Sequence, residues 1–244
     1  MRLFKSIKER FSRQSKAGYD QKKIGKQHCV VVGAGGLGSV VGLQLAMLGV
    51  KKISLVDMDN VETSNLNRQF FYEEDITSPK TEALSSKLKL LNSTIEIDTY
   101  NSKIEETNGL LKDATYVFDC LDNINTREYL NKECVEHNVP LIHAGCSDKI
   151  GEIQLILPKE TACLGCNPYP EEMKKDKRSC GDFDPSIAPT NFIVASLQID
   201  MFCNHLFGNS PKTFVSYIKD KSLSFGKVPK MKTCEVCAEW KLGK

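Results

Sequence analysis

A short apolar strand that runs directly into a glycine-rich turn is the feature that most constrains how this chain can fold. Residues 30–42 read VVVGAGGLGSVVG, and Gly33, Gly35 and Gly38 match the G-x-G-x-x-G spacing expected between a strand and a helix. Glycines at such positions allow backbone N–H groups to approach phosphate oxygens at the start of a helix. Taken alone, the turn favours NAD but fits ATP as well, and close packing of helix on strand is the alternative without a ligand.

Alternating strands and helices extend this unit over the first 145 residues. The expected strands are residues 29–32, 51–57, 94–100, 114–120 and 140–145. Helices are expected from the glycine turn to residue 48 and over residues 79–91 and 125–137, with Pro79 in a first turn. This order predicts an α/β fold with a doubly wound, mostly parallel, Rossmann-like sheet, whose ligands lie beyond the carboxyl ends of the strands.

The pattern changes after residue 145. Residues 152–158, 212–218 and 223–228 predict antiparallel strands, with a charged, proline-rich loop over 167–189 and a helix over 191–206 between them. We expect one domain over residues 1–244. Its parts are an N-terminal helical arm (1–26), a nucleotide-binding half (27–145) and a C-terminal half (146–244).

Composition excludes several classes of function. The 33 basic and 31 acidic residues leave a net charge of +2, so no broad positive face for nucleic acid is expected. The longest apolar stretches are too short for a membrane span. Ten cysteines without a secretory leader predict a reducing, cytoplasmic environment, in which closely spaced thiols are metal ligands more often than disulfides. The basic helix expected near the N-terminus is interpreted as a partner contact in preference to a membrane contact.

Charged and amide side chains follow the second expected strand and shift the balance from NAD to ATP. They are Asp57, Asp59, Asn65, Arg68, Gln69 and Lys80. A dehydrogenase needs no cations at this turn, whereas nucleotidyl transfer needs them to offset charge on the leaving pyrophosphate. Asp122, just past the strand at 114–120, adds a carboxylate that could hold magnesium at the same edge of the sheet. One such residue alone is typical of a solvated loop, but their convergence on successive strand ends favours nucleotidyl transfer.

Two C-x-x-C pairs predict a metal site that is independent of the nucleotide. Cys163 and Cys166 lie in CLGC, and Cys234 and Cys237 lie in CEVC. Each pair can present two thiolates to one tetrahedral zinc ion, which would tie the C-terminal segment back to the body of the sheet as a structural zinc clasp. A redox-active pair in each motif is the alternative.

The segments GAGGLGS, DMDNVETSNLNRQ, SPK and CLDN resemble the ThiF/MoeB/HesA family, the bacterial relatives of ubiquitin-activating enzymes. The resemblance covers the chain from about residue 10 to residue 237. It implies adenylation of a carboxyl terminus by ATP with magnesium, a ubiquitin-activating-enzyme-like fold and zinc at the four cysteines. The glycine turn, which includes Gly36, and the residues listed above would contact the nucleotide, with Asp57 on the ribose, Asn65, Arg68 and Lys80 at the phosphates and Asp122 on magnesium.

The resemblance also implies a homodimer and, in some relatives, a second step. RFSRQ is similar to a family motif whose second arginine, here Arg13, reaches the ATP of the partner subunit. Several relatives carry a cysteine near the position of Cys180, in the loop 167–189, that forms a covalent intermediate after adenylation. Nearby Lys174, Lys175, Lys177 and Arg178 could lower its pKa. The alternative for Cys180 is an unreactive loop thiol, and His143 is interpreted as an interior histidine in preference to a catalyst. Five cysteines in expected strands or helices are interpreted as small core residues: Cys29, Cys120, Cys134, Cys146 and Cys203.

The acyl donor stays open between two kinds of partner. A ubiquitin-like sulfur-carrier protein with a free C-terminus is the commonest substrate that the resemblance implies, and a short peptide for natural-product synthesis is the alternative. Two other classes of function remain: an NAD(P)-binding oxidoreductase, and a non-catalytic partner subunit. Retention of Arg13, Arg68, Lys80 and Asp122 together speaks against the non-catalytic subunit.

Overall fold

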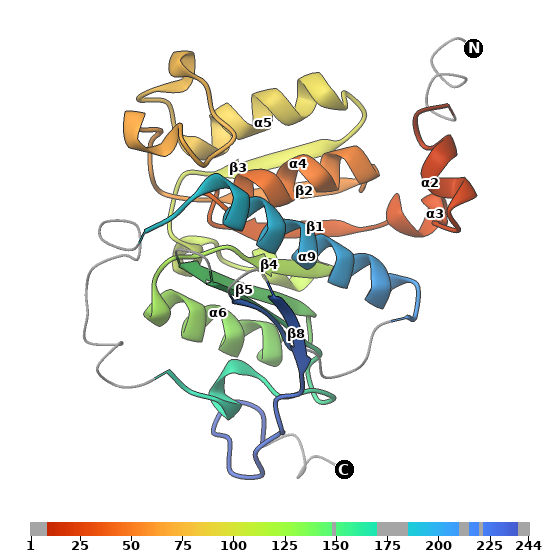
Figure 1. The fold of residues 1–244 in the computed structure, drawn as a ribbon, viewed down its shortest axis with the longest axis vertical. Coiled ribbons are helices and arrows are strands. Elements are labelled where there is room, and N and C mark those ends of the chain that lie inside the picture. Colours follow the sequence, from red (N-terminus) through yellow and green to blue (C-terminus); the bar gives the residue numbers. More distant parts are fainter. Residues whose placement is uncertain (1–8, 148–149, 170–184, 210–214, 220–221, 239–244) are drawn as a thin grey trace.

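A computed structural model describes residues 9–147, 150–169, 185–209, 215–219 and 222–238 (Figure 1). The strands are β1 His28–Val32, β2 Lys52–Val56, β3 Glu96–Tyr100, β4 Tyr116–Asp119, β5 Leu141–Ser147, β6 Ile150–Ile156, β7 Val215–Lys219 and β8 Ser222–Gly226. The α-helices are α2 Ser12–Lys16, α3 Gln21–Ile24, α4 Gly38–Leu48, α5 Lys80–Leu91, α6 Ile124–Glu136 and α9 Ala188–Leu206. The 3₁₀ helices are η1 Thr63–Asn65, η2 Glu73–Asp75, η3 Ile104–Glu106, η4 Leu110–Asp113 and η5 Leu164–Cys166.

The described strands form one eight-stranded sheet in the order β3-β2-β1-β4-β5-β6-β7-β8. The five strands from β3 to β5 pair in parallel, and β6, β7 and β8 continue the sheet in antiparallel pairs. This confirms the predicted mostly parallel α/β sheet with an antiparallel C-terminal extension. Because the parallel strands point the same way, their carboxyl ends meet at one edge of the sheet.

Two apolar layers cover the sheet. Along β1, Val31 belongs to the core that contains the inner faces of α4, α5 and α9, whereas Val30 and Val32 belong to the core beneath α6. Successive side chains of a strand point to opposite faces, and a parallel sheet covered on both faces requires apolar residues at every position. The unbroken run of valines in β1 follows from this requirement.

Two helices begin at positions that differ from the sequence expectation. Pro79 is the residue before α5 and has an extended backbone (φ −55°, ψ 131°), so it precedes the first turn that it was expected to occupy. Helix α9 begins at Ala188, three residues before the predicted start, and Pro189 lies in its first turn. Proline is tolerated there because the first N–H groups of a helix have no partner within the helix.

The N-terminal arm contacts the end of α4 that is remote from the glycine turn. The phenyl ring of Phe11 fills the space beside Gly49, where an added Cβ would lie 2.3 Å from it. The side-chain amides of Gln14 and Gln21 both donate to the carbonyl of Leu48. The predicted arm is therefore two short helices, α2 and α3, where the structure describes it. Among the described residues, no helix has the length and apolar character needed to cross a membrane.

Candidate nucleotide site and four-cysteine cluster

The glycine turn between β1 and α4 has no room for side chains at two of its glycines. Gly33 has φ +91°, and a Cβ added there would lie 2.5 Å from the carbonyl oxygen of Cys120 and 3.2 Å from the amide nitrogen of Leu121. A Cβ at Gly38 would lie 1.7 Å from the carbonyl oxygen of Gly33. The turn thus packs directly on the chain that leaves β4. At Gly35 the nearest atom lies 3.7 Å from an added Cβ, so this glycine faces more open space.

Asp57 links the end of β2 to the glycine turn. Its carboxylate accepts hydrogen bonds from the backbone N–H of Ala34 (2.6 Å) and of Asp59 (2.8 Å). Burial raises the pKa of this carboxyl, while nearby Lys80 and the two backbone bonds oppose the rise. The acid predicted to bind ribose is therefore fixed beside the turn.

Lys80 begins α5 and points to the same edge of the sheet. Its Nζ lies 2.8 Å from Oδ2 of Asp59, and its side chain is 9% exposed against 54% for Asp59. An ammonium group has three N–H donors, so Lys80 can keep this ion pair and still donate to a phosphate. The structure thus brings Asp57, Asp59 and Lys80 together, as the sequence predicted.

Three other predicted residues lie in and after η1. Asn65 is buried, and its Oδ1 accepts from the backbone N–H of Glu62. Arg68 donates through Nη1 to the carbonyl of Ser64 (2.7 Å) and to Oδ1 of Asn67 (3.0 Å). Within the described part of the chain, Gln69 Oε1 is buried and accepts no hydrogen bond, which fits a ligand that supplies a donor, such as a hydroxyl or an amine.

Asp122 lies in the turn that follows β4 and is exposed. A carboxylate oxygen in this position is a ligand that Mg²⁺ accepts, usually together with phosphate oxygens of the substrate. Gly33 packs on Cys120 and Leu121, the two residues that precede Asp122, so Asp122 lies close to the glycine turn. We give the name nucleotide edge to the glycine turn 33–38, the Leu121–Asp122 turn and the six predicted side chains of Asp57, Asp59, Asn65, Arg68, Gln69 and Lys80.

Arg13 lies at the opposite edge of the molecule. It is exposed on α2, and its neighbour Gln14 contacts the C-terminal end of α4, whereas the glycine turn precedes the N-terminal end of α4 (Figure 1). Helix α4 has 11 residues, and a rise of about 1.5 Å per residue makes it about 16 Å long. The structure therefore does not bring Arg13 to the nucleotide edge of its own chain.

Buried charged residues lie beside the nucleotide edge and were not among the predicted site residues. Asp119 at the end of β4, Arg127 on α6 and His143 within β5 are each less than one-tenth exposed, and Glu152 of β6 lies beside His143. Nδ1 of His143 lies 2.6 Å from Oδ2 of Asp119, and its Nε2 lies 3.2 Å from the hydroxyl of Tyr169. His143 is thus an interior histidine, as expected. The available sequence signal was the acidic residue inside the apolar run TYVFD.

Opposite charges set the protonation of this group, which we call the buried ion cluster (Asp119, Arg127, His143 and Glu152). Burial lowers the pKa of His143, but the charge and hydrogen bond of Asp119 and the bond to Glu152 outweigh it, and the net pKa is raised. The hydrogen bond from His143 is the largest cause that lowers the pKa of Glu152. Asp119, Arg127 and His143 are buried, whereas the side chain of Glu152 is 46% exposed. Each buried charge thus has an oppositely charged neighbour, which is the condition under which buried charges are tolerated.

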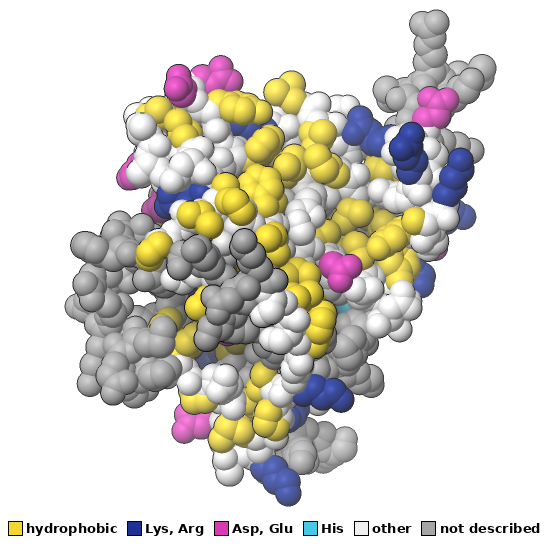
Figure 2. Space-filling view, viewed as in Figure 1, with side chains coloured by type: hydrophobic (Ala, Val, Ile, Leu, Met, Phe, Trp, Pro, Cys, Tyr) yellow, Lys and Arg dark blue, Asp and Glu magenta, His cyan; other side chains and the backbone are white. Residues whose placement is uncertain are grey.

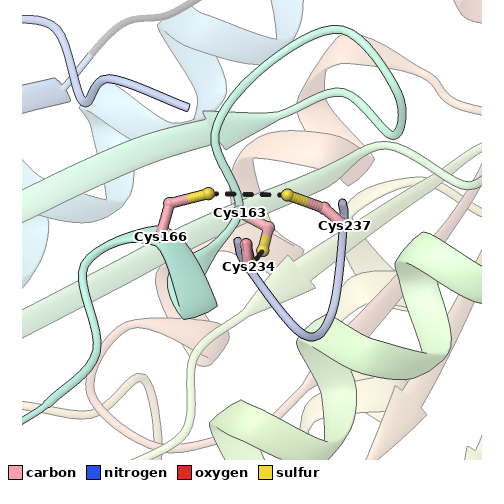
Figure 3. Close-up of side chains that lie close together, drawn as sticks. All are labelled: Cys163, Cys166, Cys234 and Cys237. Atoms are coloured by element: carbon pink, nitrogen blue, oxygen red, sulfur yellow. Dashed lines mark hydrogen bonds between the residues drawn. The ribbon is translucent and has the colours of Figure 1, made fainter. Parts of the chain in front are cut away.

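The four cysteines of the two C-x-x-C motifs meet in one place (Figure 3). Their Sγ atoms all lie within 4.8 Å of one another, with 3.6 Å between Cys163 and Cys234 and 3.4 Å between Cys166 and Cys237. Tetrahedral zinc with Zn–S bonds of about 2.3 Å requires sulfur atoms about 3.8 Å apart. Four buried thiols with these separations fit a structural zinc ion.

The redox alternative for these motifs has no support in the geometry. All four cysteines are free thiols, and the pairs at short distance join one motif to the other. Burial, with a contribution from Cys234, raises the pKa of Cys163 to about 11. A divalent cation would favour the ionised thiolates that burial alone disfavours.

The other described cysteines lie apart from the cluster, and four of them are buried as expected: Cys29, Cys120, Cys134 and Cys203. Cys180 lies outside the described residues. Cys146 was expected to be a small core residue, but it is half-buried near the C-terminal end of β5, and its thiol donates to Oδ1 of Asn191 (2.9 Å). The same Asn191 side chain lies 2.9 Å from the Cβ that Gly36 lacks, so α9 contacts the glycine turn through this residue.

Comparisons with known proteins agree with this geometry. A model of the ThiF family matches residues 7–237. The chain is 35% identical over 185 residues to the sulfur carrier protein ThiS adenylyltransferase of Escherichia coli (strain K12), covering 73% of this chain and 71% of that protein. It is 33% identical over 165 residues to the ubiquitin-like modifier-activating enzyme 5 of Drosophila mojavensis, where the match spans 61% of this chain and only 41% of that protein.

Solved structures of E. coli MccB share the fold. The crystal structure with MccA-N7isoASN has a TM-score of 0.80 at 26% identity and covers 95% of this chain and 74% of MccB. The structure of MccB with ATP has a TM-score of 0.77 at 28% identity and covers 89% of this chain and 68% of MccB. The likeness thus extends over most of this chain.

Proposed function

The chain belongs to the ThiF family, and from this premise we propose that it is an ATP-dependent adenylyltransferase. The reaction joins a substrate carboxylate to the α-phosphate of ATP, forms an acyl-adenylate and releases pyrophosphate. The observation that carries the proposal is the pairing of Lys80 with Asp59 beside Asp57 and the glycine turn. A cation there serves phosphoryl chemistry, whereas hydride transfer on a nicotinamide would not use it.

The residues of the nucleotide edge divide the work of holding ATP. Backbone N–H groups of the turn at Gly33–Gly38 would hold phosphate oxygens. The carboxylate of Asp57 would hold the ribose, and the unsatisfied Gln69 Oε1 offers a further acceptor. The phosphates would be contacted by Asn65, Arg68 and Lys80.

Catalysis in this proposal comes from position and charge. The substrate carboxylate has to lie in line with the α-phosphate, and a fixed geometry of this kind lowers the barrier by removing the need to find it. Charge that develops on the leaving pyrophosphate would be offset by Arg68 and Lys80. Magnesium, held by Asp122, would supply further positive charge at the phosphates when bound.

The proposed substrate is the C-terminal carboxylate of a ubiquitin-like sulfur-carrier protein. The support is the similarity to the ThiS adenylyltransferase over most of the chain. The second candidate is a short peptide, which is supported by the likeness to MccB, described as a microcin C7 biosynthetic enzyme in complex with N-formylated MccA. The proposals of a covalent step at Cys180 and of structural zinc at the four cysteines accompany both candidates.

A homodimer that shares its sites would explain the position of Arg13. Apolar side chains gather on the face that α4 and α9 form (Figure 2), and the exposed ones include Met47, Phe192 and Ile193. Helices α4 and α9 lie together, with Gln44 donating to Ser196, and α2 borders the same face. A second copy on this face would cover the apolar residues and could receive Arg13 at its nucleotide edge.

Mixed dimers test the shared site. We expect Arg13→Ala and Arg68→Ala each to abolish activity, and a mixture of the two variants, unfolded and refolded together, to regain it. One site of a mixed dimer would combine an intact Arg68 with an intact Arg13 from the other subunit. If Arg13 acts within its own chain, mixing the two variants restores no activity. If Arg13 has no role, Arg13→Ala is fully active. Either result contradicts the proposal.

Exchange of labelled pyrophosphate into ATP tests the reaction itself. The probes are ThiS and, for the peptide candidate, synthetic MccA, each compared with a form that lacks its last two residues. We expect exchange with one intact probe only, and loss of exchange in Arg68→Ala with an unchanged melting temperature. NADH binding without protection by ATP against heating would favour an oxidoreductase, and full activity of Arg68→Ala would refute the mechanism.

A further inference from the structure

Asp119 of the buried ion cluster binds the backbone N–H side of the Leu121–Asp122 turn. Asp119 is fully buried, and its Oδ1 accepts a hydrogen bond from the backbone N–H of Leu121 (3.1 Å). Its Oδ2 lies 2.6 Å from Nδ1 of His143. One carboxylate therefore joins the turn that carries Asp122 to a histidine on the neighbouring strand β5.

Arg127 holds the other side of the same residue. Its Nη2 donates to the carbonyl of Leu121 and, at 3.3 Å, to the carbonyl of Ala144. Gly145 leaves space for this guanidinium, since an added Cβ would lie 3.2 Å from Nη1. Both polar backbone groups of Leu121 are thus bound by side chains of the buried ion cluster.

The other ring nitrogen of His143 is held from two more elements. Nε2 lies 3.2 Å from the hydroxyl of Tyr169, after η5, and 3.6 Å from Oε1 of Glu152 on β6. The ring is 2% exposed and has an oxygen atom facing each nitrogen. Its orientation is therefore fixed, and so is the direction from which it meets Asp119.

We propose that His143 is a positioning residue, which holds Asp119 in the orientation that places the Leu121–Asp122 turn against the glycine turn. This inference rests on the proposed function, because Asp122 matters to the reaction only if it holds magnesium there. The chain of contacts runs from His143 to Asp119, then to Leu121, on which Gly33 packs. Residues that orient a metal ligand without touching the metal commonly change metal affinity about 10–100-fold when removed.

Loss of the N–H donor at His143 has a defined consequence. Asp119 would be left fully buried with one oxygen facing no donor from β5. A buried carboxylate without this partner lowers its energy by turning toward Arg127. This change alters the bond to the N–H of Leu121, and with it the position of Asp122.

Amide hydrogen exchange in the wild-type protein without metal or nucleotide gives the first test, and it is independent of activity. Asp122 is exposed, yet we expect the N–H of Leu121 to exchange about 10-fold or more slowly than that of Asp122, because Asp119 holds it. Equal exchange of the two amides in the folded protein would show that the turn is not held, and would overturn the inference.

A pair of variants of equal shape gives the second test. In His143→Asn the side-chain N–H₂ can replace Nδ1 as donor to Asp119, whereas His143→Leu has the same shape and no donor. The measurement is the magnesium concentration at half-maximal pyrophosphate exchange. We expect His143→Leu to raise it about 10-fold or more, and His143→Asn to restore it to within about threefold of wild type.

The outcomes separate this inference from the proposed function. If the wild-type protein shows no pyrophosphate exchange with either probe, the proposed function is refuted. Amide hydrogen exchange at Leu121 then still tests whether the turn is held. Active wild type with an unchanged magnesium requirement in a folded His143→Leu protein would refute the role of His143 alone. If His143→Leu does not fold, two measurements still test the role of His143: amide hydrogen exchange at Leu121 and the magnesium requirement of His143→Asn. A magnesium requirement that rises about 10-fold in His143→Asn would contradict the inference, because this variant keeps a donor to Asp119.

Discussion

The nucleotide edge and the four-cysteine cluster present their ligand atoms in opposite ways. The cysteines are 1–6% exposed, and their sulfur atoms already have separations close to those of a filled tetrahedral site. At the nucleotide edge, Asp59 and Asp122 are exposed, and Lys80 is engaged with Asp59. The cysteine site is closed and buried, whereas the nucleotide edge keeps its charged groups in contact with water or with each other.

This difference follows from how long each ligand would stay. A structural metal remains bound, so burial of its ligands costs nothing in turnover and stabilises the fold. A nucleotide must enter and leave in every cycle, and charges that stay hydrated or paired avoid the cost of an empty, buried charged site. The turns of the nucleotide edge are instead held by carboxylates that accept from backbone N–H groups, as Asp57 does from Ala34 and Asp119 does from Leu121.

The largest effect expected is loss of the four-cysteine cluster. Loss of a structural metal belongs to the mechanisms that destabilise by more than about 4 kcal/mol, which would lower the melting temperature by about 8–16 °C in a domain of this size. We expect this from Cys237→Ser and from chelation of the wild-type protein, with one zinc per chain by elemental analysis. Cys134→Ala, in the core beneath α6, is the control at about 1 kcal/mol. Equal losses of stability in Cys237→Ser and Cys134→Ala would show that the four-cysteine cluster stabilises the fold no more than an ordinary core residue does.

Two lysines of α5 sharpen the comparison at the level of single charges. Lys80→Met keeps the apolar stem and removes the ammonium, so we expect the rate of pyrophosphate exchange into ATP to fall about 10²–10³-fold. Its partner Asp59 is more than half exposed, so stability should change by less than about 1 kcal/mol.

Lys87→Met is the matched control for Lys80→Met. Lys87 pairs with Asp75 at 2.6 Å, and both side chains are about nine-tenths buried. Breaking a buried pair leaves an uncompensated charge at a cost of about 3–5 kcal/mol. We expect denaturation to show this loss while the folded fraction keeps its exchange rate. Loss of pyrophosphate exchange in folded Lys87→Met, with its stability unchanged, would show that the nucleotide edge is assigned to the wrong lysine.

Two glycines separate binding from folding within one turn. A methyl group at Gly35 meets only ordinary contacts, so Gly35→Ala should fold within about 1 kcal/mol of wild type and lose affinity for magnesium ATP about 10-fold. A methyl group at Gly38 overlaps the backbone of Gly33, so Gly38→Ala should be destabilised by about 3 kcal/mol or more. Calorimetry of binding and unfolding measures both. Unchanged affinity in Gly35→Ala would mean that phosphates do not approach this turn.

The smallest effect expected is a dependence of stability on pH through the buried ion cluster. The pKa of His143 is raised above its ordinary value of 6.5, so its stabilising contribution is complete below pH 6.5 and is lost as the pH rises through the raised pKa. The pKa of Glu152 is lowered from 4.5, so its contribution is complete above pH 4.5 and is lost as the pH falls through the lowered pKa.

Stability at the cluster is therefore greatest between pH 4.5 and 6.5, from the directions of these two pKa shifts. We expect the free energy of unfolding, from urea titrations at stepped pH, to fall above pH 6.5 more in wild type than in His143→Asn. Identical slopes in the two proteins would mean that His143 is neutral in the fold.

The sequence predicted what depends on strand order. Parallel strands place their carboxyl ends at one edge, so Asp57, Lys80 and Asp122 could be assigned to that edge without coordinates. The two C-x-x-C motifs carried their own spacing, and the meeting of Cys163 with Cys234 followed from the preference of zinc for four thiolates. Both predictions use rules that hold for any chain with the same motif.

What the sequence did not predict depends on packing between distant elements. The contact of His143 with Asp119 and Tyr169 joins three elements, and no local pattern encodes it. Cys146 was expected in the core because it lies in or beside an expected strand, and the bond to the side chain of Asn191 from α9 could not be foreseen. The direction of Arg68 toward Ser64 is a rotamer choice in the turn after η1, which spacing alone does not determine.

The separation of 71 positions between Cys163 and Cys234 has a consequence for how the protein is made. During translation the first C-x-x-C motif leaves the ribosome with two thiolates, which is half of a tetrahedral set. Helix α9 and strands β7 and β8 must be synthesised before the second motif emerges. The proposed metal would thus bind last, and a nascent chain interrupted anywhere in this interval would lack it and stay recognisable to proteases as unfinished.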